Sequence, residues 1–255
     1  MENTLLVSLS RQTALRRELD IVANNIANLN TTGFKADSPV FSEYLQTGAQ
    51  AGQFGTQDQR LSFVQDSAGW HDMSQGTIQQ TGGPLDVALD GDGMLVVQTA
   101  RGERYTRNGS LQLGPTGELM TTAADKVMGD NGPIVLQPAD KDIVITKDGT
   151  IKVREGTSLN SDTTRGKLRL VTFENPQQLR KDGASTFLAP DGVVPQPVKT
   201  INVVQGAIEK SNVRSVIAIT RMIEVSRAYA EVAGFLQQQS QMRRNSIQQL
   251  AEVPA

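Results

Sequence analysis

Residues 20–37 read DIVANNIANLNTTGFKAD, and this stretch decides how the N-terminal part of the chain folds. Its apolar side chains recur with helical spacing, yet four asparagines are threaded among them. Asparagine is a poor helix former because its carboxamide competes for backbone hydrogen bonds. Gly33 predicts the end of the helix, since glycine readily adopts the left-handed backbone found there, and Phe34 could lock that turn by packing. The asparagines therefore need a purpose other than helix formation.

The two ends of the chain carry apolar seams with alternating spacings of three and four, which are typical of coiled-coil-like helices. The N-terminal seam comprises Met1, Leu5, Ser8, Gln12, Leu15, Leu19, Val22, Ile26 and Leu29. The C-terminal seam comprises Ala218, Met222, Val225, Tyr229, Val232 and Leu236. A second C-terminal stripe widens that face enough for more than one neighbour, and it comprises Val216, Ile219, Ile223, Ala230 and Ala233. Ser211 and Asn212 are candidate N-caps.

Between the arms the apolar period changes to two and turn dipeptides multiply. IVITKDGTIKV predicts a hairpin at Asp148-Gly149, and YTRNGSLQL predicts another at Asn108-Gly109. We therefore expect an α+β fold, in which N- and C-terminal helices form a coiled-coil-like helical domain with an inserted all-β domain and an extended connector. The expected boundaries are 1–35 for the N-terminal helix, 36–80 for the connector, 81–205 for the all-β domain and 206–255 for the C-terminal helix.

The composition excludes several kinds of partner and site. The chain has 255 residues, a net charge of −2 and a pI near 5.6, so it offers no basic stripe for nucleic acid or anionic lipid. It has no cysteine, which excludes disulfides, thiolate zinc sites and cysteine nucleophiles. The short apolar stretch near Met1 is interrupted by Ser8, so we expect no Sec-type signal peptide. No window reaches the roughly 18 consecutive apolar residues of a membrane span.

Candidate catalytic and binding motifs fail one at a time. The single histidine, His71, has no nucleophile motif around it, so we interpret it as a packing or solvated residue. DGDGM at Asp90 lacks the closing glutamate of a calcium loop, because Arg101 stands there. RGKLRL has Ser161 and Leu168 where a phosphate loop needs glycine and a hydroxyl, and GDGMLV lacks the third glycine of a dinucleotide fingerprint. We expect no enzyme, metal, cofactor or small-molecule substrate.

The apolar seams must be buried. The two helices could pair with each other, and this possibility stays open. A two-helix pair would nevertheless leave the wider C-terminal face exposed, which soluble monomers rarely tolerate. Docking of each helix between those of neighbouring subunits would bury that face, and a contact that does not close on itself builds a filament or tube.

Two separated motifs resemble the terminal signatures of flagellar rod and hook proteins. VANNIANLNTTGFKAD resembles the N-terminal pattern A-N-N-[IL]-A-N-x-x-T-x-G-[FY]-[KR], and QGAIEKSNV with MIEVSRAYAEV resembles the C-terminal signature. GPLDVALDGDGMLVVQ and YTRNGSLQLGPTGEL resemble the opening of the family's β domain. The matching signature positions are Ala23, Asn24, Asn25, Ile26, Ala27, Asn28, Thr31, Gly33, Phe34, Lys35, Gln205, Gly206, Glu209, Ser211, Asn212, Val213, Met222, Ile223, Arg227, Ala228 and Tyr229.

The resemblance implies a structural subunit of the bacterial flagellar basal-body rod, located in the periplasm. The short chain and the GPLDVAL stretch favour the proximal rod; a distal rod protein is the first alternative, because distal relatives read KDVAI there. The implied subunit assembles helically into a hollow, torque-transmitting shaft that is also an export channel. Its implied partners are copies of itself, other proximal and distal rod proteins, and the flagellar type III export apparatus. A secreted β module that oligomerises through helical arms is the alternative from another class.

The resemblance also offers a purpose for the asparagines, because carboxamides can bridge packed helices and set their register without burying net charge. The alternative is that they merely solvate a surface. The predicted assembly interface comprises Leu15, Leu19, Val22, Asn24, Asn25, Ile26, Asn28, Gly33, Phe34, Met222, Val225, Tyr229, Val232 and Leu236.

Overall fold

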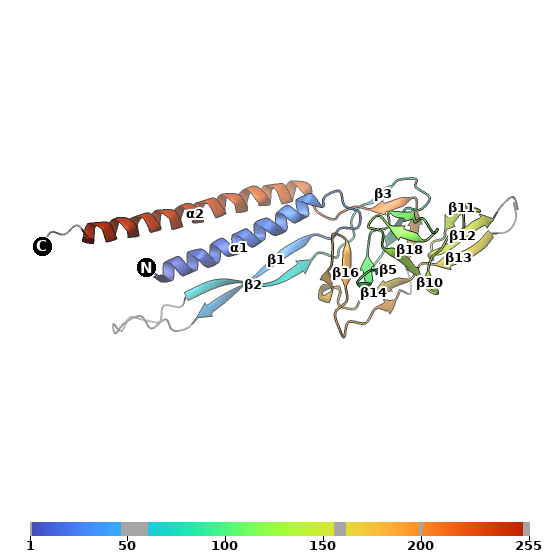
Figure 1. Cartoon of the computed structure of the whole chain (residues 1–255), viewed down its shortest axis with the longest axis horizontal. Coiled ribbons are helices and arrows are strands. Elements are labelled where there is room, and N and C mark those ends of the chain that lie inside the picture. The colour runs from blue at the N-terminus through green and yellow to red at the C-terminus, as the bar shows by residue number, and fades with distance from the viewer. Residues whose placement is uncertain (1, 47–60, 156–161, 199–200, 252–255) are drawn as a thin grey trace. The chain divides into compact units, whose positions relative to one another are not determined.

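A computed structural model describes residues 2–46, 61–155, 162–198 and 201–251, and its fold is α+β. In the order of the chain, a helix comes first, a multi-stranded β region follows and a second helix comes last, as the sequence predicts (Figure 1). Met1, Ser161 and the 47–60 part of the predicted connector lie outside the described residues. Neither helix contains a stretch apolar enough to cross a membrane, as far as the described residues go.

The elements follow one another in an order that begins and ends with a long helix. They are α1 (Glu2–Ala27), β1 (Asp37–Gln46), β2 (Leu61–His71), β3 (Ile78–Gln80), β4 (Val87–Asp90), β5 (Met94–Thr99), β6 (Gly102–Thr106), β7 (Leu111–Leu113), β8 (Leu119–Thr121), β9 (Lys126–Gly129), β10 (Gly132–Pro133), β11 (Asp140–Ile145), β12 (Thr150–Glu155), β13 (Asp162–Lys167), β14 (Leu170–Thr172), a short 3-10 helix η1 (Pro176–Gln178), β15 (Arg180–Lys181), β16 (Thr186–Leu188), β17 (Gln196–Pro197), β18 (Asn202–Gln205), β19 (Ala207–Glu209) and α2 (Ser215–Ala251).

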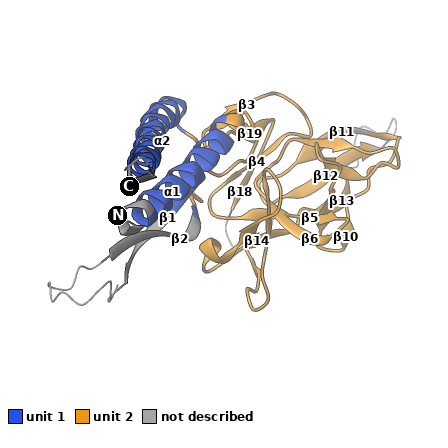
Figure 2. Ribbon diagram, turned by 60° about the vertical axis from the view of Figure 1, so that its left-hand side comes forward, with its two compact units in different colours: residues 1–26, 37–70, 214–255 blue, residues 27–36, 71–213 orange. Residues whose placement is uncertain are grey.

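The chain divides into two compact units (Figure 2). Unit 1 holds residues 1–26, 37–70 and 214–255, and therefore α1, α2 and the two-stranded sheet of β1 and β2. Unit 2 holds residues 27–36 and 71–213. Strands β1 and β2 occupy part of the segment from which we expected an extended connector, and the four predicted domain boundaries stay a prediction.

Unit 2 is built on a sheet whose main path runs β15-β16-β6-β5-β9-β8-β7. Strand β14 pairs with Met94 and Leu95 of β5, next to the residues of β5 that pair with β9. Strands β11, β12 and β13 form a separate antiparallel sheet. The last strands pair with the first ones, since β18 pairs with β4 and β19 pairs with β3. The last strands of the β region therefore lie beside its first ones, with Gln205 opposite Val87.

Strand β5 supplies side chains to two hydrophobic cores. Leu95 and Val97 point into the core that also contains Leu119, Ile151 and Leu168, whereas alternate residues of the same strand point into the second core. That second core comprises Met94, Val96, Tyr105, Val171, Phe173, Leu179 and Phe187. The continuous apolar run MLVV is thus explained by burial on both faces of the strand.

One of the two predicted hairpins is confirmed and the other is wrong. The turn at Asp148-Gly149 joins the paired strands β11 and β12. Asn108-Gly109 does not close a hairpin, because the sheet order places β5, β9 and β8 between β6 and β7. Gly109 is needed instead for a close approach to β4, where an added Cβ would lie 1.7 Å from the Val87 carbonyl oxygen.

Burial of Tyr105 in the second core generates a prediction at alkaline pH. Burial, and then the hydrogen bond from its hydroxyl to Glu103, raise the pKa of Tyr105 to about 12. Because the folded pKa lies above the ordinary tyrosine value of about 10, this residue's contribution to stability is complete below pH 10 and is lost as the pH rises towards 12.

We expect the ultraviolet absorbance of tyrosinate to include a late transition near pH 12. Tyr105→Phe should remove this transition. A late transition that survives in Tyr105→Phe would contradict the assignment.

Candidate assembly site

Helices α1 and α2 lie side by side and antiparallel in unit 1 (Figures 1 and 2). Val22 and Val225 are only 6% and 2% exposed, so each predicted seam has one residue that is buried in this unit. The Arg221 guanidinium donates a hydrogen bond to the largely buried Glu18 carboxylate at 2.6 Å. This ion pair joins α1 to α2. The pairing of the two helices, which the sequence left open as a possibility, therefore occurs within the chain.

The predicted seam residues differ in how far this pairing covers them. Most are half-buried, namely Leu15, Leu19, Ile26, Tyr229, Val232 and Leu236. Met222 is exposed at 39%. Their part in contacts between subunits stays a prediction, since unit 1 already uses most of them.

The second stripe of α2 faces away from α1. Val216, Ile219 and Ile223 are 76%, 48% and 49% exposed, and their spacing puts them on one helical face roughly opposite Val225. Large aliphatic residues in one exposed row are unusual on a protein that remains monomeric. Within the described residues these three members of the predicted stripe are therefore largely exposed.

Two of the predicted asparagines bond within their own chain. The Asn25 carboxamide donates to the Asp37 carbonyl oxygen at 2.7 Å and accepts from the Asp37 N–H at 2.9 Å. The Asn28 side chain accepts a hydrogen bond from the Thr31 hydroxyl at 3.0 Å, and Asn24 is exposed. Asn25 therefore fixes the first residue of β1 to the last turns of α1.

Gly33 and Phe34 lie inside unit 2. Gly33 has a φ of +68°, and its N–H donates to the Glu209 carbonyl oxygen at 2.8 Å. The Phe34 ring is fully buried, with the Lys181 ammonium 3.8 Å from its centre. The predicted turn at Gly33 thus exists, and it brings the N-terminal signature against the C-terminal one.

Lys35 and Glu209 form a buried ion pair beside this turn. Their side chains are 0% and 1% exposed, and Lys35 Nζ donates to Glu209 Oε1 at 2.7 Å and to the Ser74 carbonyl oxygen at 2.6 Å. The same carboxylate oxygen accepts from the Gly76 N–H at 2.9 Å, and Arg107 Nη1 lies 3.6 Å from Oε2. Burial lowers the pKa of Lys35, while Glu209 opposes that shift.

Asn212 completes this group of contacts. Its Oδ1 accepts from the Ala36 N–H at 2.8 Å, and its Nδ2 donates to the carbonyl oxygens of Asp72 at 2.7 Å and Ser74 at 3.1 Å. The prediction that Asn212 caps the C-terminal helix is wrong, because α2 begins at Ser215. We call residues 33–36, 72–76 and 209–212 the junction.

Sequence reasoning missed the pairing within the junction. Lys35, Glu209 and Asn212 were recognised as signature positions, but the sequence gives no measure of which signature residues touch. The available clue was the presence of one basic residue in the N-terminal motif and one acidic residue in the C-terminal motif.

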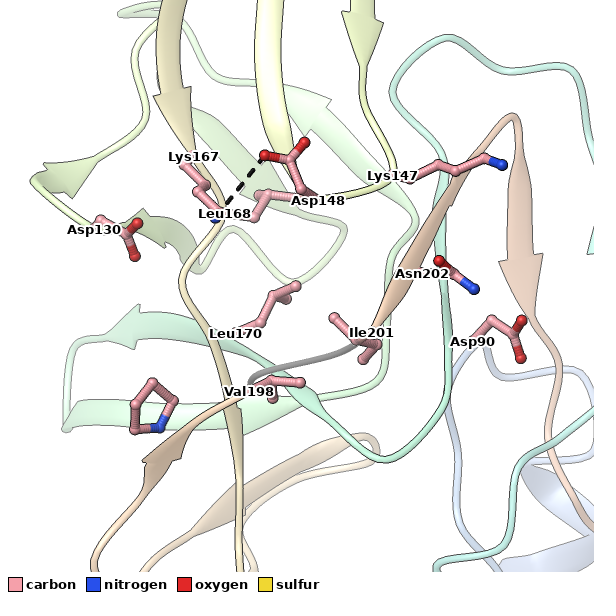
Figure 3. Close-up of a pocket in the computed structure, with 11 residues that line it drawn as sticks. Asp90, Asp130, Lys147, Asp148, Lys167, Leu168, Leu170, Val198, Ile201 and Asn202 are labelled. Atoms are coloured by element: carbon pink, nitrogen blue, oxygen red, sulfur yellow. Dashed lines mark ion pairs between the residues drawn. The ribbon is translucent and has the colours of Figure 1, made fainter.

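A cavity of about 510 Å³ in unit 2 shows no catalytic arrangement (Figure 3). Its floor is apolar and its rim carries both signs of charge, with Lys167 3.9 Å from Asp148. The hydroxyl groups of Thr146 and Thr150 lower the pKa of Asp148 to about 2, so this carboxylate is held as a turn-forming anion rather than poised for proton transfer. Within the described residues no cluster of His, Asp and Glu could hold a metal ion.

His71 packs in unit 2 instead of joining a catalytic group. Its ring meets Phe187 edge-on with a centroid distance of 5.9 Å, and its backbone N–H and carbonyl both bond the Gln177 side chain. The contacts of His71 with Phe187 and Gln177 are therefore packing and backbone contacts.

Three family models match separate parts of the chain. The model described as flagella basal body rod protein matches residues 5–35, that of the flagellar hook protein FlgE/F/G D1 domain matches 88–153, and that of the flagellar basal body rod FlgEFG protein C-terminal matches 204–250. The chain is 37% identical to the flagellar basal-body rod protein FlgF of Caulobacter vibrioides, over 99% of this chain and 100% of that protein. The chain belongs to the flagellar basal-body rod protein family.

Other relatives agree with this assignment. The Salmonella typhimurium FlgF protein is 34% identical over 90% of both chains, and the Bacillus subtilis FlgG protein is 31% identical over 90% of this chain and 92% of the relative. The recognition from the two terminal motifs is therefore confirmed. This rod protein is a structural component of the flagellar basal-body rod and not an enzyme.

The left-handed turn at Gly33 yields a stability prediction with a matched control. An added Cβ at Gly33 would lie 2.4 Å from backbone atoms of Arg107 and Asn108, whereas Gly82 has φ +73° and nothing within 4 Å. Gly82→Ala should lower the free energy of unfolding by roughly 1–2 kcal/mol, the cost of a left-handed L residue. Gly33→Ala should cost clearly more, because it adds a backbone clash. Urea unfolding of both variants measures this, and equal losses would refute the close packing at Gly33.

Proposed function

We propose that this rod protein is a proximal-rod subunit that assembles helically, through its terminal helices, with copies of itself and with other rod proteins. The observation that carries the proposal is the exposed aliphatic row Val216, Ile219 and Ile223 on α2. Val225 of the same helix is buried in unit 1, whereas this row is largely exposed among the described residues, so we assign it an apolar partner from a neighbouring subunit.

The helix pair supplies the framework for that contact. Val22, Val225 and the Glu18–Arg221 ion pair hold α1 and α2 together as a coiled-coil-like domain, into which the β region is inserted in the sequence. The row on α2 is aliphatic, whereas the exposed positions of α1 include Arg16, Asp20 and Asn24, so two copies meeting through these faces make a heterologous contact. Heterologous contacts that do not close generate helical filaments, which suits a rod.

The more specific role, that of a proximal-rod subunit, is inferred from the relatives. Two of the relatives described above are FlgF proteins, which supports the proximal rod over the distal-rod alternative. The assembled subunits would form a hollow shaft in the periplasm that transmits torque and passes later subunits, and the flagellar type III apparatus would export the chain. The remaining alternative, a secreted β module with helical arms, would form closed oligomers without rod partners.

Within this proposal the predicted interface residues divide by task. Those that pack inside unit 1 shape the helix pair, and they include Leu15, Leu19, Val22, Ile26, Val225, Tyr229, Val232 and Leu236. Asn25, Gly33 and Phe34 fix the chain where the helices end, whereas Met222, Asn24 and Asn28 remain candidates for contact with a neighbour.

The double variant Ile219→Ser/Ile223→Ser tests the exposed row. Both residues project into solvent in the free chain, so thermal stability of the purified protein should change little. Incorporation into purified basal bodies should fall sharply, because covering the exposed part of each side chain is worth roughly half of the 1.5–3 kcal/mol that complete burial contributes. Quantitative immunoblotting of basal bodies measures the incorporated protein.

The matched control is Arg227→Ser/Glu231→Ser, which makes two substitutions at the same spacing, on exposed positions, without changing net charge. It should incorporate almost normally, because exposed charges contribute little. Equal incorporation of the two double variants would remove the aliphatic row as the assembly surface.

A further inference from the structure

The chain passes from each helix into unit 2 through the junction. Residues 28–36 follow α1, and residues 209–213 precede α2, and both stretches belong to unit 2. Gly33 and Glu209 share a backbone hydrogen bond, and Asn212 bonds Ala36. The last residues after one helix and the first before the other are therefore bound directly to each other.

The ion pair at the centre of the junction is sensitive to loss of either charge. Lys35 Nζ and Glu209 Oε1 are both sealed from solvent, and each also bonds a backbone group of residues 74–76. Breaking a buried pair by removing one partner leaves the other charge without compensation, whereas replacing both partners by uncharged groups is often tolerated. The two kinds of change can therefore be told apart by experiment.

Arg107 makes the two single losses unequal. Its guanidinium donates to the carbonyl oxygens of Leu89 and Gly91 and lies 3.6 Å from Glu209 Oε2. Without Lys35, the Glu209 carboxylate still faces one cation. Without Glu209, Lys35 and Arg107 are two buried cations that have lost their shared carboxylate, so this loss is the more damaging.

We propose that Lys35 and Glu209 are positioning residues for rod assembly, which clamp the stretch that follows α1 to the stretch that precedes α2. The inference rests on the proposed assembly through the terminal helices. Neither residue has to touch a neighbouring subunit. The pair acts by giving the two helices fixed points of departure, so that each subunit presents them to its neighbours in the same way.

The clamp is measurable in the free, full-length protein. The chain has no cysteine, so Asn30→Cys and Lys210→Cys introduce a unique pair of exposed labelling sites beside the junction. Spin labels at these sites report the separation of the two stretches by double electron–electron resonance. The unmodified junction should give one narrow distance distribution.

Four further variants in this labelled background test the charges. Lys35→Met should broaden the distribution and Glu209→Gln should broaden it more. Lys35→Met/Glu209→Gln should give an intermediate width, because it removes both unpaired charges but also the bond that joins the two stretches. The control Asp142→Asn removes one partner of an ion pair that is exposed on both sides, and it should change nothing. Near-ultraviolet circular dichroism of the core around Tyr105 verifies that each variant is folded. If Glu209→Gln does not fold, Lys35→Met alone tests the clamp, because it keeps the contact between Arg107 and Glu209.

Assembly is read separately, by immunoblotting basal bodies from the same variants without labelling cysteines. We expect single-charge variants to lose on the order of tenfold or more in incorporation and the double variant to recover part of it. Narrow distributions in both single variants would overturn the clamp. Broad distributions with normal incorporation would overturn its role in assembly, whereas normal incorporation of Ile219→Ser/Ile223→Ser would instead refute the proposed assembly surface.

Discussion

The ion pair between Lys35 and Glu209 joins residues that are 174 positions apart, so the fold has to bring these two charges together. A cation and an anion can be taken out of water together only if each finds its partner and further hydrogen bonds. Those bonds come from Ser74 and Gly76, so a third segment is drawn into the same place. The β region between the two signatures must consequently begin and end at one point.

This constraint agrees with the pairing of the strands. Strand β19, which ends in Glu209, pairs with β3, and β18 pairs with β4, so the last strands of unit 2 lie on its first ones. Strand β5 is buried on both faces and organises the cores. A β region closed in this way returns the chain to where it entered, which allows two helices from opposite ends of the sequence to meet in one unit.

The sequence predicted the parts whose signal is local. Apolar spacing predicted both helices, and the turn at Asp148-Gly149 was read from a dipeptide. The same reasoning gave a wrong hairpin at Asn108-Gly109. Gly109 is required there because its backbone lies close to that of Val87, and this contact leaves no local pattern in the sequence. Lys35 with Glu209 escaped prediction for the same reason. Their pairing depends on strand order, which a periodic pattern does not encode.

The asparagines of residues 20–37 and the aliphatic row on α2 make different kinds of contact. At position 25 an aspartate could accept the Asp37 N–H but could not donate to the Asp37 carbonyl, and a leucine could do neither. A neutral carboxamide is thus the side chain that satisfies both groups without burying charge. Hydrogen bonds of this kind have strict geometry and suit contacts that form once, within the chain. Hydrophobic contacts do not depend on direction in this way. The aliphatic row on α2 is exposed in the free chain, which suits a contact that forms only when another subunit binds.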